Sequence, residues 1–98
     1  MRTISRERLM QKLEKAYPEI WMRQSEEFDG IGGRIWTVSE SCPTDKEGLP
    51  IFSNESKYTD FKEEFYTMGV RNHLRNFLER NGWYVEWYDS ATLMIAPV

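Results

Sequence analysis

The hydrophobic period of the chain changes at the dipeptide Asn81-Gly82. Before it, apolar side chains recur at helical spacing in one stripe, which consists of Val70, Leu74, Phe77 and Leu78. After it, residues 83–88 (WYVEWY) have the aromatic and β-branched composition that is typical of a strand. Glycine adopts the left-handed conformation just past a helix without a Cβ penalty. The dipeptide therefore predicts a helix over 68–81 that passes directly into a strand over 83–88.

The N-terminal part of the chain predicts a second helix and a hairpin. Ser5 is a good N-cap, and Pro18 disfavours the helical conformation in the residue before it, so we expect a helix over 5–17. The segments 19–25 and 33–40 are rich in aromatic and β-branched residues, and three glycines lie between them. Glycine supplies the positive φ angles that a reversal needs. We therefore expect two antiparallel strands.

The remaining segments are a return strand and an irregular middle region. Residues 92–96 follow a turn-like Asp-Ser-Ala sequence and precede a proline, which predicts a strand that pairs with 83–88. Residues 41–60 show no regular pattern and are interpreted either as a short edge strand or as a loop held by two apolar side chains. Asp60 and Glu63 fit a capping box, which predicts a short turn or helical lead-in over 60–66.

These elements follow one another as α-β-β-loop-α-β-β. Two hairpins most simply form one four-stranded antiparallel sheet, and two helices with narrow apolar stripes would cover one face of it. The sequence therefore predicts an α+β two-layer sandwich. At 98 residues, the whole range 1–98 is expected to form a single domain.

The strands carry more large apolar side chains than one sheet face can bury. Alternation along the last two strands directs one set toward the helices: Trp83, Val85, Trp87, Leu93 and Ile95. The opposite set is Tyr84, Glu86 and Tyr88, and in the first hairpin the surplus falls on Trp21 or Trp36.

Three interpretations of this surplus stay open. In the first, the loop residues Leu49, Ile51 and Phe52 fold over the second sheet face and complete a small core. In the second, the surplus aromatics form an interface with another protein or with a second copy of the chain, since exposed aromatic patches mark interaction sites. In the third, the aromatics stack on a small ligand or a nucleotide. The candidate binding residues are Trp21, Trp36, Tyr84 and Tyr88.

Charge is distributed unevenly along the chain. The whole sequence has 13 basic and 16 acidic side chains, so it lacks the basic footprint on which phosphate binding depends, and a nucleic-acid partner is not expected. Residues 40–66 hold three lysines against seven acidic residues. This acidic segment is either a solvated loop or a surface that meets a basic partner. Its candidate contact residues are Glu55, Asp60, Glu63 and Glu64.

The residue types needed for catalysis or metal binding are scarce. Cys42 is the single cysteine and His73 the single histidine, so we expect no disulfide, no zinc site, no cofactor and no enzymatic activity. We interpret His73 as a half-buried histidine that flanks the apolar stripe of its helix. The lack of a disulfide favours a reducing cytoplasm. We expect neither a secretory signal nor a membrane span, because no apolar run of sufficient length exists.

The C-terminal third, from Gly69-Val70 through residues 81–89 to Met94-Ile95, together with residues 48–52 (GLPIF), resembles small proteins carried by bacteriophages and prophages. The resemblance implies a small acidic domain that occupies the surface of a host macromolecule, as inhibitors of host defence do. It transfers no catalytic or binding residue. Our first hypothesis is therefore a non-enzymatic binding protein in the host cytoplasm, and the alternatives are a homodimeric accessory subunit or a module that binds a small molecule or nucleotide.

Overall fold

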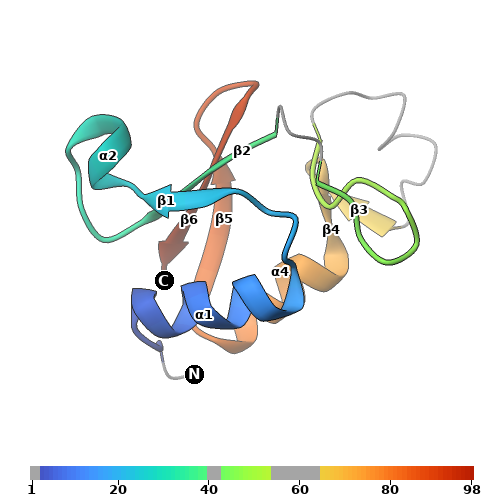
Figure 1. The fold of residues 1–98 in the computed structure, drawn as a ribbon, viewed down its shortest axis with the longest axis horizontal. Helices are drawn as coiled ribbons and strands as arrows, with labels where there is room; N and C mark the ends of the chain where they lie inside the picture. The colour runs from blue at the N-terminus through green and yellow to red at the C-terminus, as the bar shows by residue number, and fades with distance from the viewer. Residues whose placement is uncertain (1–2, 40–42, 54–64) are drawn as a thin grey trace.

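The computed structural model describes residues 3–39, 43–53 and 65–98, and its elements are labelled in Figure 1. In chain order the elements are α1 (Arg6–Ala16), β1 (Met22–Gln24), α2 (Glu26–Asp29), β2 (Ile35–Val38), β3 (Tyr66–Thr67), β4 (Val70–Arg71), α4 (Asn72–Arg80), β5 (Trp83–Trp87) and β6 (Thr92–Pro97). The predicted α+β fold is confirmed. None of the helices among these residues is long and apolar enough to cross a membrane.

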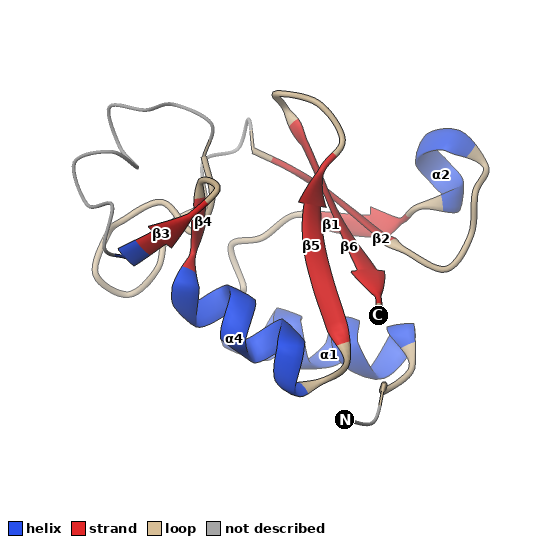
Figure 2. Cartoon of the chain, turned by 180° about the vertical axis from the view of Figure 1, so that it is seen from behind, coloured by secondary structure: helices blue, strands red, loops and turns tan. Residues whose placement is uncertain are grey.

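The main sheet has four antiparallel strands in the order β1-β2-β6-β5. The two predicted hairpins, β1-β2 and β5-β6, are joined through the pairing of β2 with β6, in which Trp36 lies opposite Met94. Helices α1 and α4 lie on the same side of this sheet in both views of the chain (Figures 1 and 2). We call the sheet face toward these two helices the inner face and the opposite one the outer face.

Helix α1 begins and ends as its sequence predicts, within one residue. The Ser5 hydroxyl accepts a hydrogen bond from the Arg8 N–H at 3.3 Å, and the helix stops at Tyr17, the residue before Pro18. Leu9 and Leu13 are fully buried, because they lie one turn apart on the face that meets the sheet.

The core lies between the inner face and the two helices. Its residues are Leu9, Leu13, Ile20, Ile35, Ile51, Phe52, Val70, Leu74, Leu78, Trp83, Val85, Leu93 and Ile95. Four of the five side chains predicted to point inward are buried, and the fifth, Trp87, is partly buried against the same cluster.

The predicted start of the second helix is wrong. Residues 66–71 form the small hairpin β3-β4, and α4 begins only at Asn72. Gly69 has φ +76° and Met68 has φ +52°, which are left-handed conformations that a helix interior excludes. Val70 is still buried, but from a strand. Of the lead-in predicted over 60–66, residues 60–64 lie outside the described part, and Tyr66 belongs to β3.

The first hairpin is also shorter than the predicted 19–25 and 33–40, and its connection holds the helix α2 instead of a simple glycine turn. The Ser25 side chain explains the difference. Its hydroxyl donates to the Ile31 carbonyl at 2.7 Å and accepts from the Arg34 N–H at 3.1 Å, so the chain folds into a compact loop before β2 begins.

The 43–53 segment packs into the main core. Ile51 and Phe52 are 1% and 0% exposed, and the Arg71 N–H donates to the Ile51 carbonyl at 2.8 Å. Phe52 lies opposite Val70 in an isolated bridge, so the segment runs beside β4. The interpretation in which Leu49, Ile51 and Phe52 cover the outer face is therefore wrong, because Ile51 and Phe52 belong to the inner core.

Candidate functional site

The structure brings three of the four predicted aromatic residues together on the outer face. The rings of Trp21 and Trp36 meet edge to face, with their centroids 4.8 Å apart. Phe28 of α2 connects this pair to Tyr88, because its ring centroid lies 5.0 Å from that of Trp36 and 4.9 Å from that of Tyr88. We call these four side chains the outer aromatic cluster. The fourth predicted residue, Tyr84, is on the same face of β5 but makes none of these ring contacts.

The role of Phe28 was not predicted from the sequence. The ion pairs of α2 hold this residue in place. Asp29 binds Arg34 at 2.8 Å, and Glu26 binds Arg6 of α1 at 2.6 and 2.9 Å. The hydrogen bonds from Arg6 lower the pKa of Glu26 to about 2. One aromatic residue among acidic neighbours (EEFD) was the only sequence signal that this segment covers an apolar surface.

The β5 side of the outer face is open. Tyr84 and Tyr88 are 41% and 55% exposed, and the exposed carboxylate of Glu86 lies between them at the alternate position. We call these three residues the β5 strip. Trp21 and Trp36 are partly buried, and the indole N–H of Trp36 is buried without a hydrogen-bond partner in the described part of the chain. The predicted acidic contacts Glu55, Asp60, Glu63 and Glu64 lie outside the described residues.

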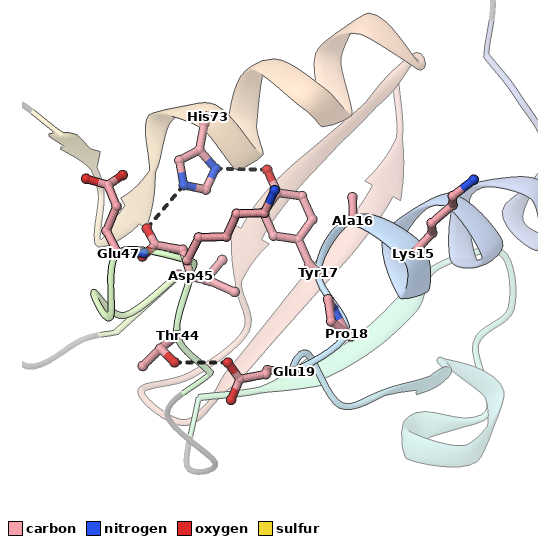
Figure 3. Close-up of a pocket in the computed structure, with 11 residues that line it drawn as sticks. Lys15, Ala16, Tyr17, Pro18, Glu19, Thr44, Asp45, Glu47 and His73 are labelled. Carbon is pink, nitrogen blue, oxygen red and sulfur yellow. Dashed lines mark hydrogen bonds and ion pairs between the residues drawn. The ribbon is translucent and has the colours of Figure 1, made fainter.

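A cleft opens at a second place, where the C-terminal end of α1, the 44–51 segment and α4 meet (Figure 3). Its volume is about 510 Å³, within the range of roughly 300–1,000 Å³ that small-molecule sites occupy. The lining residues are Lys15, Ala16, Tyr17, Pro18, Glu19, Thr44, Asp45, Lys46, Glu47, Ile51 and His73.

A chain of polar contacts forms one wall of this cleft. The Tyr17 hydroxyl lies 2.8 Å from His73 Nδ1, and His73 Nε2 lies 3.4 Å from Asp45 Oδ2 (Figure 3). The same Asp45 oxygen lies 3.2 Å from Arg71 Nη2, and both of these side chains are buried. At the other end of the cleft, the Thr44 hydroxyl donates to Glu19 at 3.0 Å.

The charge state of Asp45 fixes the direction of these hydrogen bonds. Burial opposes ionisation of Asp45, but the Leu49 N–H, the imidazole of His73, the Glu47 N–H and Arg71 together lower its pKa below the ordinary value. An ionised Asp45 can only accept, so in neutral His73 the proton is on Nε2 and Nδ1 accepts from the Tyr17 hydroxyl. Burial raises the pKa of the Tyr17 phenol, so this group keeps its proton near neutral pH.

Sequence reasoning missed this wall because its members lie far apart in the chain. His73 was interpreted only as a histidine beside the apolar stripe, and it is half-buried, but its two ring nitrogens bind residues from α1 and from the 44–51 segment. The available signals were the helix end that Pro18 imposes on Tyr17 and the turn Asp45-x-x-Gly48, in which Asp45 accepts from the N–H of Glu47. Within the described residues, no group of three or more histidine, cysteine or acidic side chains is placed to hold a metal ion.

Comparison with known proteins adds no relative. No protein-family model matches the chain, and searches of curated proteins and of solved structures found no match.

Proposed function

We propose that this chain is a non-enzymatic binding protein of phage origin that occupies the surface of a host protein in the host cytoplasm. The observation that carries the proposal is the β5 strip beside the outer aromatic cluster. Tyr84 and Tyr88 are exposed in a small domain whose other large apolar strand side chains are buried or partly buried, and tyrosine is enriched among the residues that dominate binding energies.

The rigidity of this surface supports a binding role. The Tyr88 ring is held by Phe28, which is held by α2 and its two ion pairs. A side chain that is already ordered loses less conformational entropy when a partner binds. The strip is therefore prepared for contact before the partner arrives.

The charges of the strip define the chemistry of the partner. Glu86 is exposed between the two tyrosines, and Asp89 follows Tyr88 at the end of the strand. Arg34, in the loop after α2, is already paired with Asp29. An arginine-rich protein surface fits this strip, because a guanidinium can pair with the carboxylate and stack on a tyrosine ring. The net charge of −3 would favour the encounter with such a surface.

The test is affinity capture from a bacterial lysate with matched variants, followed by binding to the purified partner. The double variant Tyr84→Ser/Tyr88→Ser and the single variant Glu86→Lys should lose one stoichiometric protein that the wild type captures. Met68→Ser is the control for removal of an exposed apolar side chain, since Met68 is 75% exposed on the β3-β4 turn. Glu79→Lys on α4 is the control for charge reversal.

Each outcome has a defined meaning. A partner that is lost with the strip variants, retained by both controls and weakened by salt supports the proposal. A partner that all variants retain contradicts the assignment to the strip. A wild type that captures no protein and sediments as a dimer would favour a second copy of the chain as the occupant instead.

A further inference from the structure

The cleft next to His73 has the features of a ligand site that is separate from the outer face. Three segments converge on it, and a buried Ile51 with the Tyr17 ring, Ala16 and Pro18 gives it an apolar wall. The polar wall is fixed in advance, because both nitrogens of His73 and all oxygens of Asp45 already have partners. Apolar cavities with a few convergent polar groups are the usual form of small-molecule sites.

The acidic side chains near the cleft are largely neutralised. Asp45 Oδ1 accepts from the N–H groups of Glu47 and Leu49 at 2.9 and 3.1 Å, and its Oδ2 lies beside Arg71 and His73. Glu47 also binds Arg71, at 3.1 Å. Glu19 holds the Thr44 hydroxyl at the opposite end, away from His73 in Figure 3. The acids beside His73 therefore have little capacity left to bind a cation.

The two lysine ammonium groups at the cleft, in contrast, have no acceptor among the described residues. Lys46 lines the cleft, and no hydrogen bond or ion pair of its ammonium group occurs among the described residues. Lys15 is also unpaired there, but its side chain extends away from His73 in Figure 3, so we assign the contact to Lys46. An unpaired ammonium group next to an apolar wall fits a planar apolar molecule that carries an oxyanion.

Protonation of His73 would add a second donor. In neutral His73, Nδ1 accepts the hydrogen bond that the Tyr17 hydroxyl donates. When His73 gains a proton, Nδ1 becomes a donor to the Tyr17 oxygen, and the hydroxyl hydrogen must turn elsewhere. The cleft is the open space beside this hydroxyl. The charged and titratable groups of the cleft and its polar wall are Lys15, Tyr17, Glu19, Asp45, Lys46, Glu47, Arg71 and His73 itself, and Arg80 of α4 acts on the Tyr17 phenol.

We propose that this cleft binds a small aromatic carboxylate or phosphate, that Lys46 and the Tyr17 hydroxyl contact its oxyanion, and that binding is coupled to protonation of His73. The anion stabilises the imidazolium form, and this form releases the Tyr17 hydroxyl as a donor. Binding therefore takes up a proton, and affinity increases as the pH falls.

His73 is its own reporter, because it is the single histidine of the sequence and its ring protons give an unambiguous NMR signal. The probes are benzoate and phenyl phosphate, and benzamide is the neutral analogue of benzoate. Benzoate or phenyl phosphate should shift the His73 signals saturably. Benzoate, whose charge is constant over this range, should bind more tightly at about pH 6 than at about pH 8. Whichever anion binds more tightly identifies the oxyanion class.

Three variants separate the contacts from a general effect of charge or folding. Lys46→Met should weaken binding of the anion about tenfold, the loss expected for one charge-assisted hydrogen bond. Lys12→Met is the matched control, because Lys12 binds Asn81 and does not line the cleft. Tyr17→Phe keeps the ring but should remove the dependence of affinity on pH.

Several results would overturn the proposal. They are an absence of saturable shifts with both anions, equal affinity for benzamide and benzoate, equal losses in the two lysine variants, and an unchanged pH dependence in a folded Tyr17→Phe variant. If Tyr17→Phe does not fold, the Lys46→Met comparison decides, since Lys46 is exposed.

Discussion

Trp83 and Trp36 lie on opposite faces of the same sheet, and their indole N–H groups are treated differently. Trp83 is 2% exposed on the inner face, and its N–H donates to the Ile4 carbonyl at 2.9 Å. The N–H of Trp36 on the outer face is equally inaccessible but has no partner in the described ranges. On the inner face, the buried indole N–H of Trp83 therefore has a hydrogen-bond partner, whereas on the outer face the packing of Trp36 leaves its N–H without one in the described part of the chain.

The coverage of the two faces differs in the same way. Two helices of 11 and 9 residues cover the inner face with aliphatic side chains. One helix of four residues reaches the outer aromatic cluster, and it contributes one ring, Phe28. We infer that the inner face provides most of the stability and that the outer face tolerates substitution better.

The largest expected difference in stability is between variants of a residue that packs on the inner face and of one that packs on the outer face. Leu74→Ala should lower the free energy of unfolding by about 3 kcal/mol, because Leu74 is fully buried and the change leaves a cavity. Phe28→Ala should cost about 1 kcal/mol, because Phe28 is only partly buried under a short helix. Urea denaturation of both variants measures the difference. Equal losses would contradict the division between the faces.

The next prediction concerns how firmly the 43–53 segment belongs to the inner side. A Cβ on Gly69 would lie 2.4 Å from the Ser53 carbonyl oxygen, and its φ of +76° is also unfavourable. Gly69→Ala should therefore cost about 2.5 kcal/mol, more than the strain of the backbone alone. Gly48→Ala is the control, with φ +80° and no atom within 4 Å, and it should cost about 1 kcal/mol in thermal denaturation. Equal losses of stability in the two variants would mean that the 43–53 segment shifts to accommodate the added Cβ.

Asp45 extends the comparison to buried charge. Asp45→Asn should lower the free energy of unfolding by about 2 kcal/mol at neutral pH, because among the described residues Arg71 then keeps only the exposed Glu47 as an anionic partner. The folded pKa of Asp45 lies below its unfolded value, so its contribution is present above the unfolded pKa and is lost as the pH falls through the folded pKa. Urea denaturation of wild type and variant at several pH values should therefore converge below about pH 4. A difference in the free energy of unfolding that stays constant with pH would show that the stabilisation does not come from the charge of Asp45.

The smallest effects test the two indoles directly. Trp83→Phe should cost about 1.5 kcal/mol, since it removes a buried hydrogen bond and leaves the Ile4 carbonyl unpaired. Trp36→Phe should cost less than about 0.5 kcal/mol, because the loss of ring area is offset by removal of an unsatisfied N–H. Differential scanning calorimetry of the pair would show the order, and a reversed order would show that the Trp36 N–H is in fact satisfied.

Local signals in the sequence predicted the elements whose ends are determined by single residues. Ser5 and Pro18 bound α1, Gly82 ends α4, and alternation gave the orientation of β5. The start of α4 was mispredicted because Val70 fits the helical stripe equally well from a neighbouring strand. Whether a residue at this position is helical depends on Gly69 and on its contact with Ser53, which is distant in sequence.

The candidate sites could be predicted only in part, for a related reason. Trp36 and Tyr88 follow from strand alternation, which is local. Phe28 is a single aromatic residue in a four-residue helix, too short for a periodic signal. The cleft depends on the contacts of His73 with Tyr17, 56 positions away in the sequence, and with Asp45, 28 positions away. Only the tertiary fold brings these residues together.

The turn at Asn81–Trp83 has a consequence for how the chain is connected. Ile4 donates to the Asn81 carbonyl at 3.1 Å, and Val98 donates to the neighbouring Gly82 carbonyl at 3.0 Å. Ile4 and Val98, which are far apart in the sequence, thus attach to adjacent peptide units. The backbone is in effect a ring closed by hydrogen bonds. A short linker could close it covalently, and a circular permutant opened at the exposed Ser90 should keep the same topology.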